Sequence, residues 1–386
     1  MNWDNYCYVP FLKTQEAELK AVQELTSGVK GKILPFVILT RARSNGKAYL
    51  ERHPDEIDGD IDKNLKKWKD GFGVSSPFFL DLSSEEVRQN TQIMDLIVPD
   101  EGYCNWVNFV REKKQEFPHI IPLIQINDEA DTSEGENKRL QLQSLLKDFD
   151  YVGYREEIFS SEDDANDFAG YIHETLKGVL IADGKAPAKL VLILDVGYLF
   201  PKKYSQAADK VVKILNAIGD LCIQHVIVTG TSFPLTLSDF VEDQKADEYE
   251  GILHSETVPM YQRIKNEYSG ATIPIYGDYA LIHPVKNTVA SYARGWIPRI
   301  DVSCGDTMSF IRRRRGKDGD YGATYQDVAY RIISKEWFAN VPKCWGKDKI
   351  NDAAWGKVEQ VIPRFWVAVR ANIHMSTIVE ERGKRK

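Results

Sequence analysis

The chain has 386 residues and a formal net charge of −7, with 43% hydrophobic and 28% charged residues. This composition is typical of a globular protein and excludes a largely disordered chain. The mild acidity argues against wholesale coating of nucleic acid, but it leaves room for one local basic site. At this length, the chain forms one large domain or two to three ordinary ones.

The residues give no sign of a membrane span or a secretory signal. There is no run of about 18 apolar residues, and the first ten residues lack the basic and apolar segments of a signal peptide. The five cysteines are scattered and never form a CxxC pair. We therefore expect a cytoplasmic protein with no membrane partner, no disulfide framework and no clustered zinc site.

In chain order, the first expected element is an amphipathic helix over residues 11–31. Short apolar runs rich in β-formers follow it, and most of them are continuous rather than alternating, as in strands covered on both faces. Eight such runs occur, at residues 32–39, 76–83, 120–127, 150–157, 189–199, 224–233, 271–280 and 296–303. Their starts are 25 to 47 residues apart, which leaves room for a helix between successive strands.

Eight units of this size predict an α/β fold of the (β/α)8 type, a TIM-like barrel. An open doubly wound sheet is the alternative, but the chain has neither GxGxxG nor GxxxxGK[ST]. The helix at 11–31 would then be an extra N-terminal helix before the first strand. The C-terminal tail, residues 305–386, is much longer than the single helix that would close the barrel. We expect a barrel over residues 1–310 and an appended helical and irregular element over residues 311–386, packed on the barrel.

The carboxyl ends of the strands form the functional face of such a barrel, so polar residues there are candidates for a site. Asp81, Asp195 and Asp278 each end an apolar strand, where a lone buried carboxylate would be very costly. They could serve as acid/base groups or Mg²⁺ ligands. Alternatively, Asp81 caps a helix and Asp195 holds loop amides or an arginine. His283 is the acid/base candidate whose imidazole titrates near neutrality.

Other residues complete this expected face. The hydroxyls of Thr231 and Ser232 could bind an anion, or they could simply belong to a turn stopped by Pro234. Arg155 could also contact an anion. The further candidates for the mouth of the barrel are Gln125, Asn127, Tyr279, Asp301 and, if the tail folds back, His374. No HxH or HExxH pattern indicates a metal site.

Four consecutive arginines, at positions 312 to 315, stand out in an acidic chain. On a helix, Arg312 and Arg315 would share one face. Planar guanidinium groups suit phosphate or carboxylate, so the run could bind a nucleotide, a nucleic-acid backbone or an acidic partner. It could equally be a solvated face neutralised by nearby acids such as Asp320, since charge runs are usually surface features.

Several stretches resemble the Beta protein family, which takes its name from the gop–beta–cII module of a temperate satellite coliphage. These are the N-terminal string from residue 8, LDVG at 194, VTGTSFP at 228, YGDYALIHP at 276, and the closing Trp/His segment. The resemblance covers about residues 8–380. One departure is at Ile300, where the family pattern continues with Arg-Tyr and this chain with Asp301 and Val302. The resemblance implies a phage, prophage or defence context with a toxin-like partner, and it implies no known reaction.

Three functions follow as hypotheses. The first is a regulatory or sensing component of a toxin–antitoxin-like anti-phage module, which binds a neighbouring module protein through the barrel mouth and tail and needs no cofactor. The alternative is a phosphodiesterase-like hydrolase that uses the strand-end aspartates, with Mg²⁺ or acid/base chemistry. The third is single-stranded nucleic-acid binding through Arg and Trp side chains of the tail.

Overall fold

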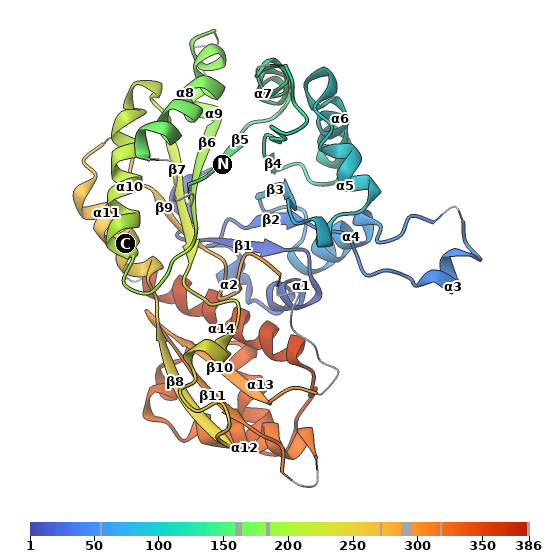
Figure 1. The fold of residues 1–386 in the computed structure, drawn as a ribbon, viewed down its shortest axis with the longest axis vertical. Coiled ribbons are helices and arrows are strands. Elements are labelled where there is room, and N and C mark those ends of the chain that lie inside the picture. Colours follow the sequence, from blue (N-terminus) through green and yellow to red (C-terminus); the bar gives the residue numbers. More distant parts are fainter. Residues whose placement is uncertain are drawn as a thin grey trace.

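Parallel strands curl into a nearly closed barrel, which forms the upper half of the molecule in Figure 1. The structure is a computed structural model that describes residues 1–54, 56–133, 135–158, 164–182, 186–270, 272–286, 295–316 and 319–383. The eight barrel strands are β1 (Val9–Lys13), β2 (Phe36–Leu39), β3 (Phe78–Leu82), β4 (Ile120–Pro122), β5 (Val152–Glu157), β6 (Leu190–Tyr198), β7 (His225–Thr231) and β9 (Ile275–Asp278).

The strand order leaves one weak seam in the barrel wall. The strands are arranged as β4-β3-β2-β1-β9-β7-β6-β5, so β4 and β5 are the two edges. A single parallel bridge between Leu123 and Gly153 joins these edges, and the Ile124 amide donates to the Gly153 carbonyl at 2.9 Å. The wall therefore closes there with one bridge, whereas the other neighbouring strands share two to six registered residue pairs.

Helices alternate with the strands and cover the outside of the barrel. The long ones are α1 (Glu16–Gln23), α4 (Ile61–Phe72), α6 (Asp100–Glu116), α7 (Glu136–Asp148), α8 (Ala165–Ala182), α10 (Tyr204–Ala217), α11 (Thr257–Glu267) and α14 (Pro363–Gly383). Helix α4 shows why they form: the Asp60 side chain caps its first turn, and Ile61, Leu65, Trp68 and Phe72 recur at helical spacing on its buried face. Within the described residues, no helix is both long and apolar enough to cross a membrane.

Short helical elements occupy the connections. These are α2 (Ser27–Lys30), α3 (Lys47–Leu50), α5 (Thr91–Leu96), α9 (Ala186–Lys189), η1 (Trp3–Asn5), η2 (Glu86–Arg88), η3 (Gly219–Leu221), η4 (Leu237–Phe240) and η6 (Glu336–Asn340). The α3 segment belongs to an arm that projects away from the barrel (Figure 1).

A second layer lies beside the barrel, in the lower half of Figure 1. It is an antiparallel sheet of order β10-β11-β8, with α12 packed on β10 and β11 and with α13 packed on α12 and α14. Its elements are β8 (Glu248–His254), β10 (Arg299–Cys304), β11 (Thr307–Arg313), α12 (Tyr321–Ile333) and α13 (Trp345–Ala354). The chain enters this layer twice, once after β7 and once after β9, and returns each time to a barrel helix.

Helix α14 joins the two layers. Ala371 and Met375 belong to the core between barrel and helices, whereas Trp366, Val369 and Ile373 belong to the core of the antiparallel layer. The helix is therefore buried between the two layers, and its buried surface carries polar side chains such as Arg370 and His374 as well as apolar ones.

The predicted (β/α)8 barrel is confirmed, but two predicted elements are wrong in detail. Residues 9–13 form the first barrel strand, so the helix predicted over 11–31 is represented by α1, the first barrel helix, and the run at 32–39 supplies the second strand. The run at 296–303 supplies β10 of the antiparallel sheet and not an eighth barrel strand. One barrel strand was missed and one was wrongly assigned, so the predicted number of barrel strands, eight, is still correct.

The arginine run also differs from its prediction. Arg312 and Arg313 are the last residues of strand β11, so Arg312 and Arg315 do not share a helix face. Residue 310, the expected end of the barrel unit, falls inside the same strand. The division of the chain into domains stays a prediction.

Gly277 in β9 gives a test of the barrel packing. A methyl group there would lie 3.0 Å from the Val9 carbonyl oxygen and 3.2 Å from both Phe11 and Thr229. Because these neighbours are fixed in the wall, we expect Gly277→Ala to lower the unfolding free energy by about 1–3 kcal/mol in urea denaturation. Gly170→Ala on α8, where nothing lies within 4 Å, is the control and should be neutral or stabilising. Equal effects at both sites would contradict this packing.

Candidate functional site

The interior of the barrel is apolar at depth and charged at the mouth. Strand alternation places Phe79, Ile193 and Ile227 in the inner core, and the same parity carries Asp81 and Asp195 to the inside two residues later. The polar side chains gathered there, called the mouth cluster below, are Asp81, Gln125, Arg155, Glu157, Asp195 and Tyr279. Of these, all except Glu157 were predicted from the sequence.

Arg155 is the centre of the mouth cluster. Its Nη2 lies 2.7 Å from Asp195 Oδ2, and its Nε donates to the same oxygen at 3.0 Å. Its Nη1 reaches Asp81 Oδ2 at 3.4 Å, and Nη2 also lies 2.7 Å from Glu157 Oε1 and 3.1 Å from the Tyr279 hydroxyl. One guanidinium group thus contacts residues of β3, β5 and β6 and the residue after β9.

The remaining acceptors in the cluster are also occupied. Asp195 is completely buried. Its Oδ2 accepts a hydrogen bond from the Tyr279 hydroxyl, and its Oδ1 accepts one from the Gly197 backbone amide at 2.9 Å. Asp81 Oδ1 accepts from the Gln125 amide group at 3.2 Å. Burial raises the pKa of Asp81 despite the nearby Arg155, and burial raises the pKa of Tyr279 well above its usual range. The cluster is a closed network in which Asp195 can act as a base only if Arg155 moves.

Asp278 lies on the opposite side of the wall from the mouth cluster. Tyr279 points inward, so its neighbour Asp278 points outward, toward α14. There its Oδ2 lies 2.8 Å from His374 Nε2, and it accepts from the Tyr8 and Tyr276 hydroxyls. Burial alone would raise the pKa of Asp278, but His374 and the two tyrosines hold it below its usual value.

His374 connects this carboxylate to the antiparallel layer. Its Nδ1 lies 2.9 Å from the Ser303 hydroxyl on β10. The tail therefore folds back onto the barrel, but His374 reaches Asp278 and not the mouth cluster. This chain of three polar groups fixes β9, α14 and β10 relative to one another.

Other predicted residues have local roles. His283 packs on the Tyr198 ring with centroids 5.2 Å apart, and burial lowers the pKa of its imidazole. Thr231 Oγ1 accepts from the Phe233 amide at 3.1 Å, and Ser232 Oγ accepts from the Glu256 amide at 3.0 Å. The Thr231 hydroxyl therefore holds a local turn, whereas the Ser232 hydroxyl ties the end of β7 to the residue that precedes α11.

Asn127 and Asp301 also lie away from Arg155. The backbone N–H of Asn127 donates to the Tyr103 hydroxyl at 2.9 Å. Asp301, on β10, accepts from Arg299 Nε at 2.7 Å and from Arg370 Nη1 at 2.6 Å. Burial raises the pKa of Asp301, but Arg299 and Arg370 bring it below its usual value.

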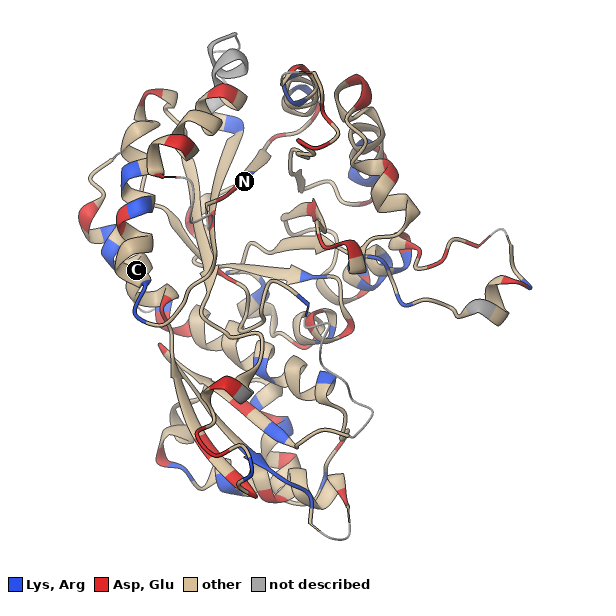
Figure 2. Ribbon diagram, in the orientation of Figure 1, with Lys and Arg blue, Asp and Glu red and all other residues tan. Residues whose placement is uncertain are grey.

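The arginine run finds most of its partners inside the chain. Arg312 and Arg314 donate to the Gln244 carbonyl at 3.2 and 2.7 Å, and Arg313 pairs with the Asp327 carboxylate. Arg315 lies over the Tyr321 ring, 4.2 Å from its centre. The negative partners are therefore mainly carbonyl oxygens, and Figure 2 shows the run as a blue segment at the lower end of the antiparallel sheet.

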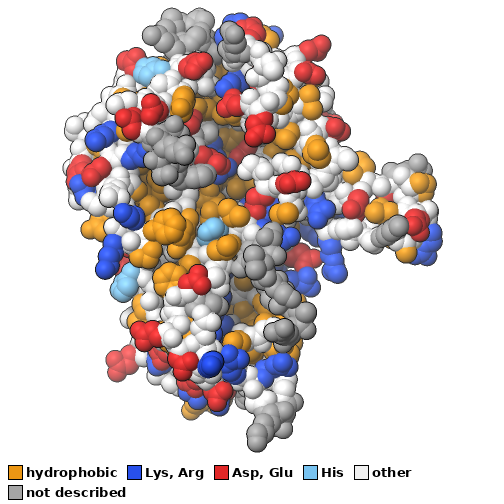
Figure 3. Space-filling model, viewed as in Figure 1, with side chains coloured by type: hydrophobic (Ala, Val, Ile, Leu, Met, Phe, Trp, Pro, Cys, Tyr) orange, Lys and Arg blue, Asp and Glu red, His pale blue; other side chains and the backbone are white. Residues whose placement is uncertain are grey.

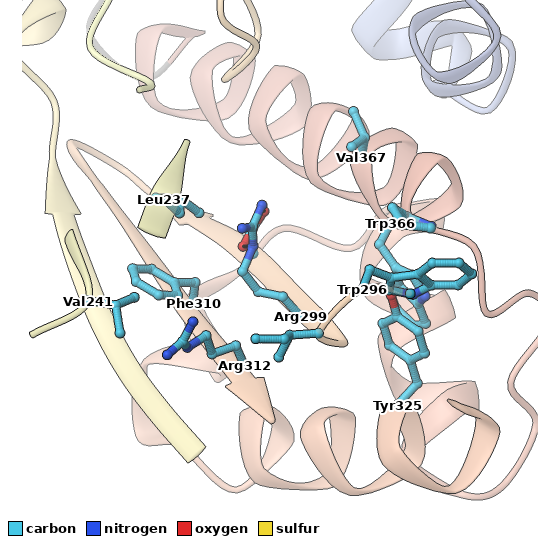
Figure 4. A pocket seen from close by; sticks show the side chains of 13 residues that line it. Leu237, Val241, Trp296, Arg299, Phe310, Arg312, Tyr325, Trp366 and Val367 are labelled. Carbon is cyan, nitrogen blue, oxygen red and sulfur yellow. Dashed lines mark hydrogen bonds and ion pairs between the residues drawn. The ribbon is translucent and has the colours of Figure 1, made fainter. Parts of the chain in front are cut away.

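A cavity of about 300 Å³ lies between the antiparallel sheet, α12 and the first turn of α14 (Figure 4). Trp296, Tyr325 and Trp366 gather at one end, and the Tyr325 and Trp366 rings stack with centroids 4.8 Å apart. Arg312 lies at the other end, near Phe310 and Val241, and Arg299 lies between the two groups. We call it the aromatic–arginine pocket. The sequence analysis noted the tryptophans and arginines of the tail but could not predict that they share a cavity.

The buried guanidinium of Arg312 is incompletely paired. Its side chain is 7% exposed, and its Nε has no hydrogen-bond partner among the described atoms. Burial, together with the nearby Arg314 and Arg299, lowers its pKa. Arg312 thus contributes to the lining of the pocket a guanidinium group whose hydrogen-bond acceptors are the Asp243 and Gln244 carbonyl oxygens.

The described residues hold no group of three or more His, Cys, Asp or Glu side chains arranged to bind a metal ion. The Mg²⁺ ligand set predicted from Asp81, Asp195 and Asp278 is divided, since Asp278 faces out of the barrel and the other two face in. The residues present therefore do not fit that ion as a shared ligand set.

The fold and these sites define a (β/α)8-barrel protein with an internally paired mouth and an accessory antiparallel layer. The family model described as Beta protein matches residues 8–380, so the chain belongs to the Beta protein family. It is also 25% identical over 382 residues to "Protein beta" of Enterobacteria phage P4, which covers 98% of this chain and 94% of the phage protein.

We expect the stability of the protein to depend on pH because of Glu156, which follows Arg155 on β5. Burial, with repulsion from Asp128 and Glu157, raises its pKa from 4.5 to about 7. Between these values the folded protein binds a proton that the unfolded chain does not, so the unfolding free energy falls as pH rises. We expect Glu156→Gln to stabilise the protein more at pH 8 than at pH 5 in urea denaturation, relative to the unchanged protein.

The control is Glu112→Gln, since the Glu112 side chain is 71% exposed. Its effect should be the same at both pH values. A Glu156→Gln effect that is independent of pH would contradict the raised pKa.

Proposed function

We propose that this protein is a regulatory or sensing component of a phage- or prophage-encoded defence module, and that it acts by binding a partner protein. The observation that carries the proposal is the aromatic–arginine pocket, in which the stacked rings of Tyr325 and Trp366 line the same cavity as two arginines, Arg299 and Arg312. Membership of a family that includes a phage protein supports the phage context. The proposal places the protein in the cytoplasm, where its five cysteines would stay reduced.

The charges of the pocket favour an acidic partner. Asp301 is the carboxylate in its lining, and it is shared between Arg299 and Arg370. Arg312 has only backbone carbonyls as hydrogen-bond acceptors within the described chain. A partner segment with an acidic side chain next to an aromatic one would meet the guanidinium groups of Arg299 and Arg312 and stack on Trp366, as in protein interfaces anchored by Arg and Trp.

The position of the pocket supports binding on the mouth side of the molecule. Leu237 and Val241 come from the connection after β7, Trp296 and Arg299 from the connection after β9, and Trp366 from the start of α14. All three segments lie at the carboxyl ends of the strands, where barrel proteins bind their ligands. The mouth cluster nearby is closed by Arg155, which favours a structural role for its carboxylates over the hydrolase alternative.

The proposal predicts how pocket variants behave. We expect the double variant Arg299→Ala, Arg312→Ala to weaken binding of the co-expressed product of the adjacent gene by at least tenfold, since two charge-assisted contacts are lost. Arg139→Ala on α7, an exposed arginine paired with Glu136, is the matched control and should bind normally. Binding is measured by titration of the purified pair.

A phage-protection assay separates this proposal from the hydrolase alternative. Asp195→Asn keeps the shape of the side chain and should preserve both partner binding and protection. Loss of protection in Asp195→Asn with intact folding and intact partner binding would contradict the binding proposal and indicate catalysis at the mouth.

A further inference from the structure

A second cavity, of about 420 Å³, lies at the rim of the barrel mouth. Its walls come from the connections after β1, β2, β3 and β9 and from the first turn of α14. Arg364 of α14 lines this cavity, whereas Pro363, Trp366 and Val367 of the same turn line the aromatic–arginine pocket. The two cavities thus lie on different sides of the start of α14.

The lining of this cavity is strongly basic, and we call it the basic cavity. Its cationic residues are Arg41, Arg43, Lys67, Arg88, Lys286 and Arg364, and its described lining includes one carboxylate, Glu16. Figure 3 shows Lys and Arg side chains gathered near α4 and the base of the arm that carries α3. Such a concentration of positive charge in a chain of net charge −7 marks a local attraction for anions.

Internal pairing neutralises only part of this charge. Glu16 pairs with Arg364, and Glu85 pairs with Arg88 at 3.0 Å. Within the described ranges, no carboxylate forms an ion pair with the other four cations, which are Arg41, Arg43, Lys67 and Lys286. The side chains of these four are exposed, so they can reorient toward a ligand.

The uncharged part of the lining indicates which portion of a ligand is recognised. The floor carries Thr14, Gln15 and Asn64, and Asn64 Nδ2 donates to the Thr40 carbonyl at 2.9 Å. No aromatic ring is among the described lining residues, so a nucleobase would find nothing to stack on. Guanidinium forks and ammonium groups together suit a chain of phosphates.

We propose that the basic cavity binds the oligophosphate group of a small molecule, such as a nucleoside triphosphate. A volume of about 420 Å³ accommodates a ligand of this size. The inference does not depend on the partner-binding proposal, because the residues that carry it are distinct from those of the aromatic–arginine pocket.

The test titrates the full chain with inorganic triphosphate, with ATP and with a 12-nucleotide single-stranded DNA, using isothermal calorimetry. We expect both small oligophosphates to bind with a dissociation constant on the order of 10–100 µM at low salt and more weakly at high salt. The double variant Arg41→Ala, Lys67→Ala should weaken this binding at least tenfold.

The matched control is Arg52→Ala, Lys66→Ala. Lys66 is the exposed neighbour of Lys67 on α4, Arg52 is exposed on the arm, and neither lines the cavity. The control should bind within twofold of the unchanged protein, with all variants showing the same thermal unfolding. Failure of triphosphate and ATP to bind, or equal losses in both double variants, would overturn the proposal. Binding of the DNA alone would also overturn it in favour of a nucleic-acid backbone site.

Discussion

The arrangement of the barrel mouth depends on the ion pairs of Arg155. Its strand, β5, is one edge of the sheet, and only one backbone bridge joins it to the other edge, β4. Arg155 forms an ion pair with Asp195 of β6, on its own side of the seam, and another with Asp81 of β3, on the far side. Gln125, which follows β4, also donates to Asp81. A buried charge would be costly alone, so each member of the network requires the others. Side chains thus supply the closure that the backbone provides elsewhere in the wall.

A second buried network links the accessory layer to the barrel. Helix α14 contributes Met375 to one core and Ile373 to the other, and its His374 links Asp278 of β9 to Ser303 of β10. Both cavities used in the proposals border the first turn of this helix. A ligand in either one would contact an element that both layers hold in place.

Much of the fold was predictable from the sequence because continuous apolar runs separated by helices leave few alternatives to a barrel. The strand at 9–13 escaped because it is short and contains Pro10. The β10 run was assigned to the barrel because it is apolar like a barrel strand, whereas its partner is β11 and the third strand of that sheet, β8, lies about 50 residues earlier in the chain. Asp81, Arg155 and Asp195 were predicted to meet, and they do. The sequence could not show that Asp278 faces the other side of the wall, since a shift of one residue along a strand reverses the side that a side chain faces. The cavities bring together residues from distant connections, and no local pattern reveals that.

Hydrogen exchange across the seam tests the central role of Arg155 most directly. In Arg155→Met, we expect peptides that cover residues 120–126 and 150–156 to exchange their amide hydrogens faster than in the unchanged protein. Peptides that cover the fully paired strands β1 and β2 should keep their rates. Unchanged exchange at the seam, or the same acceleration throughout the barrel, would contradict the account in which this arginine closes the wall.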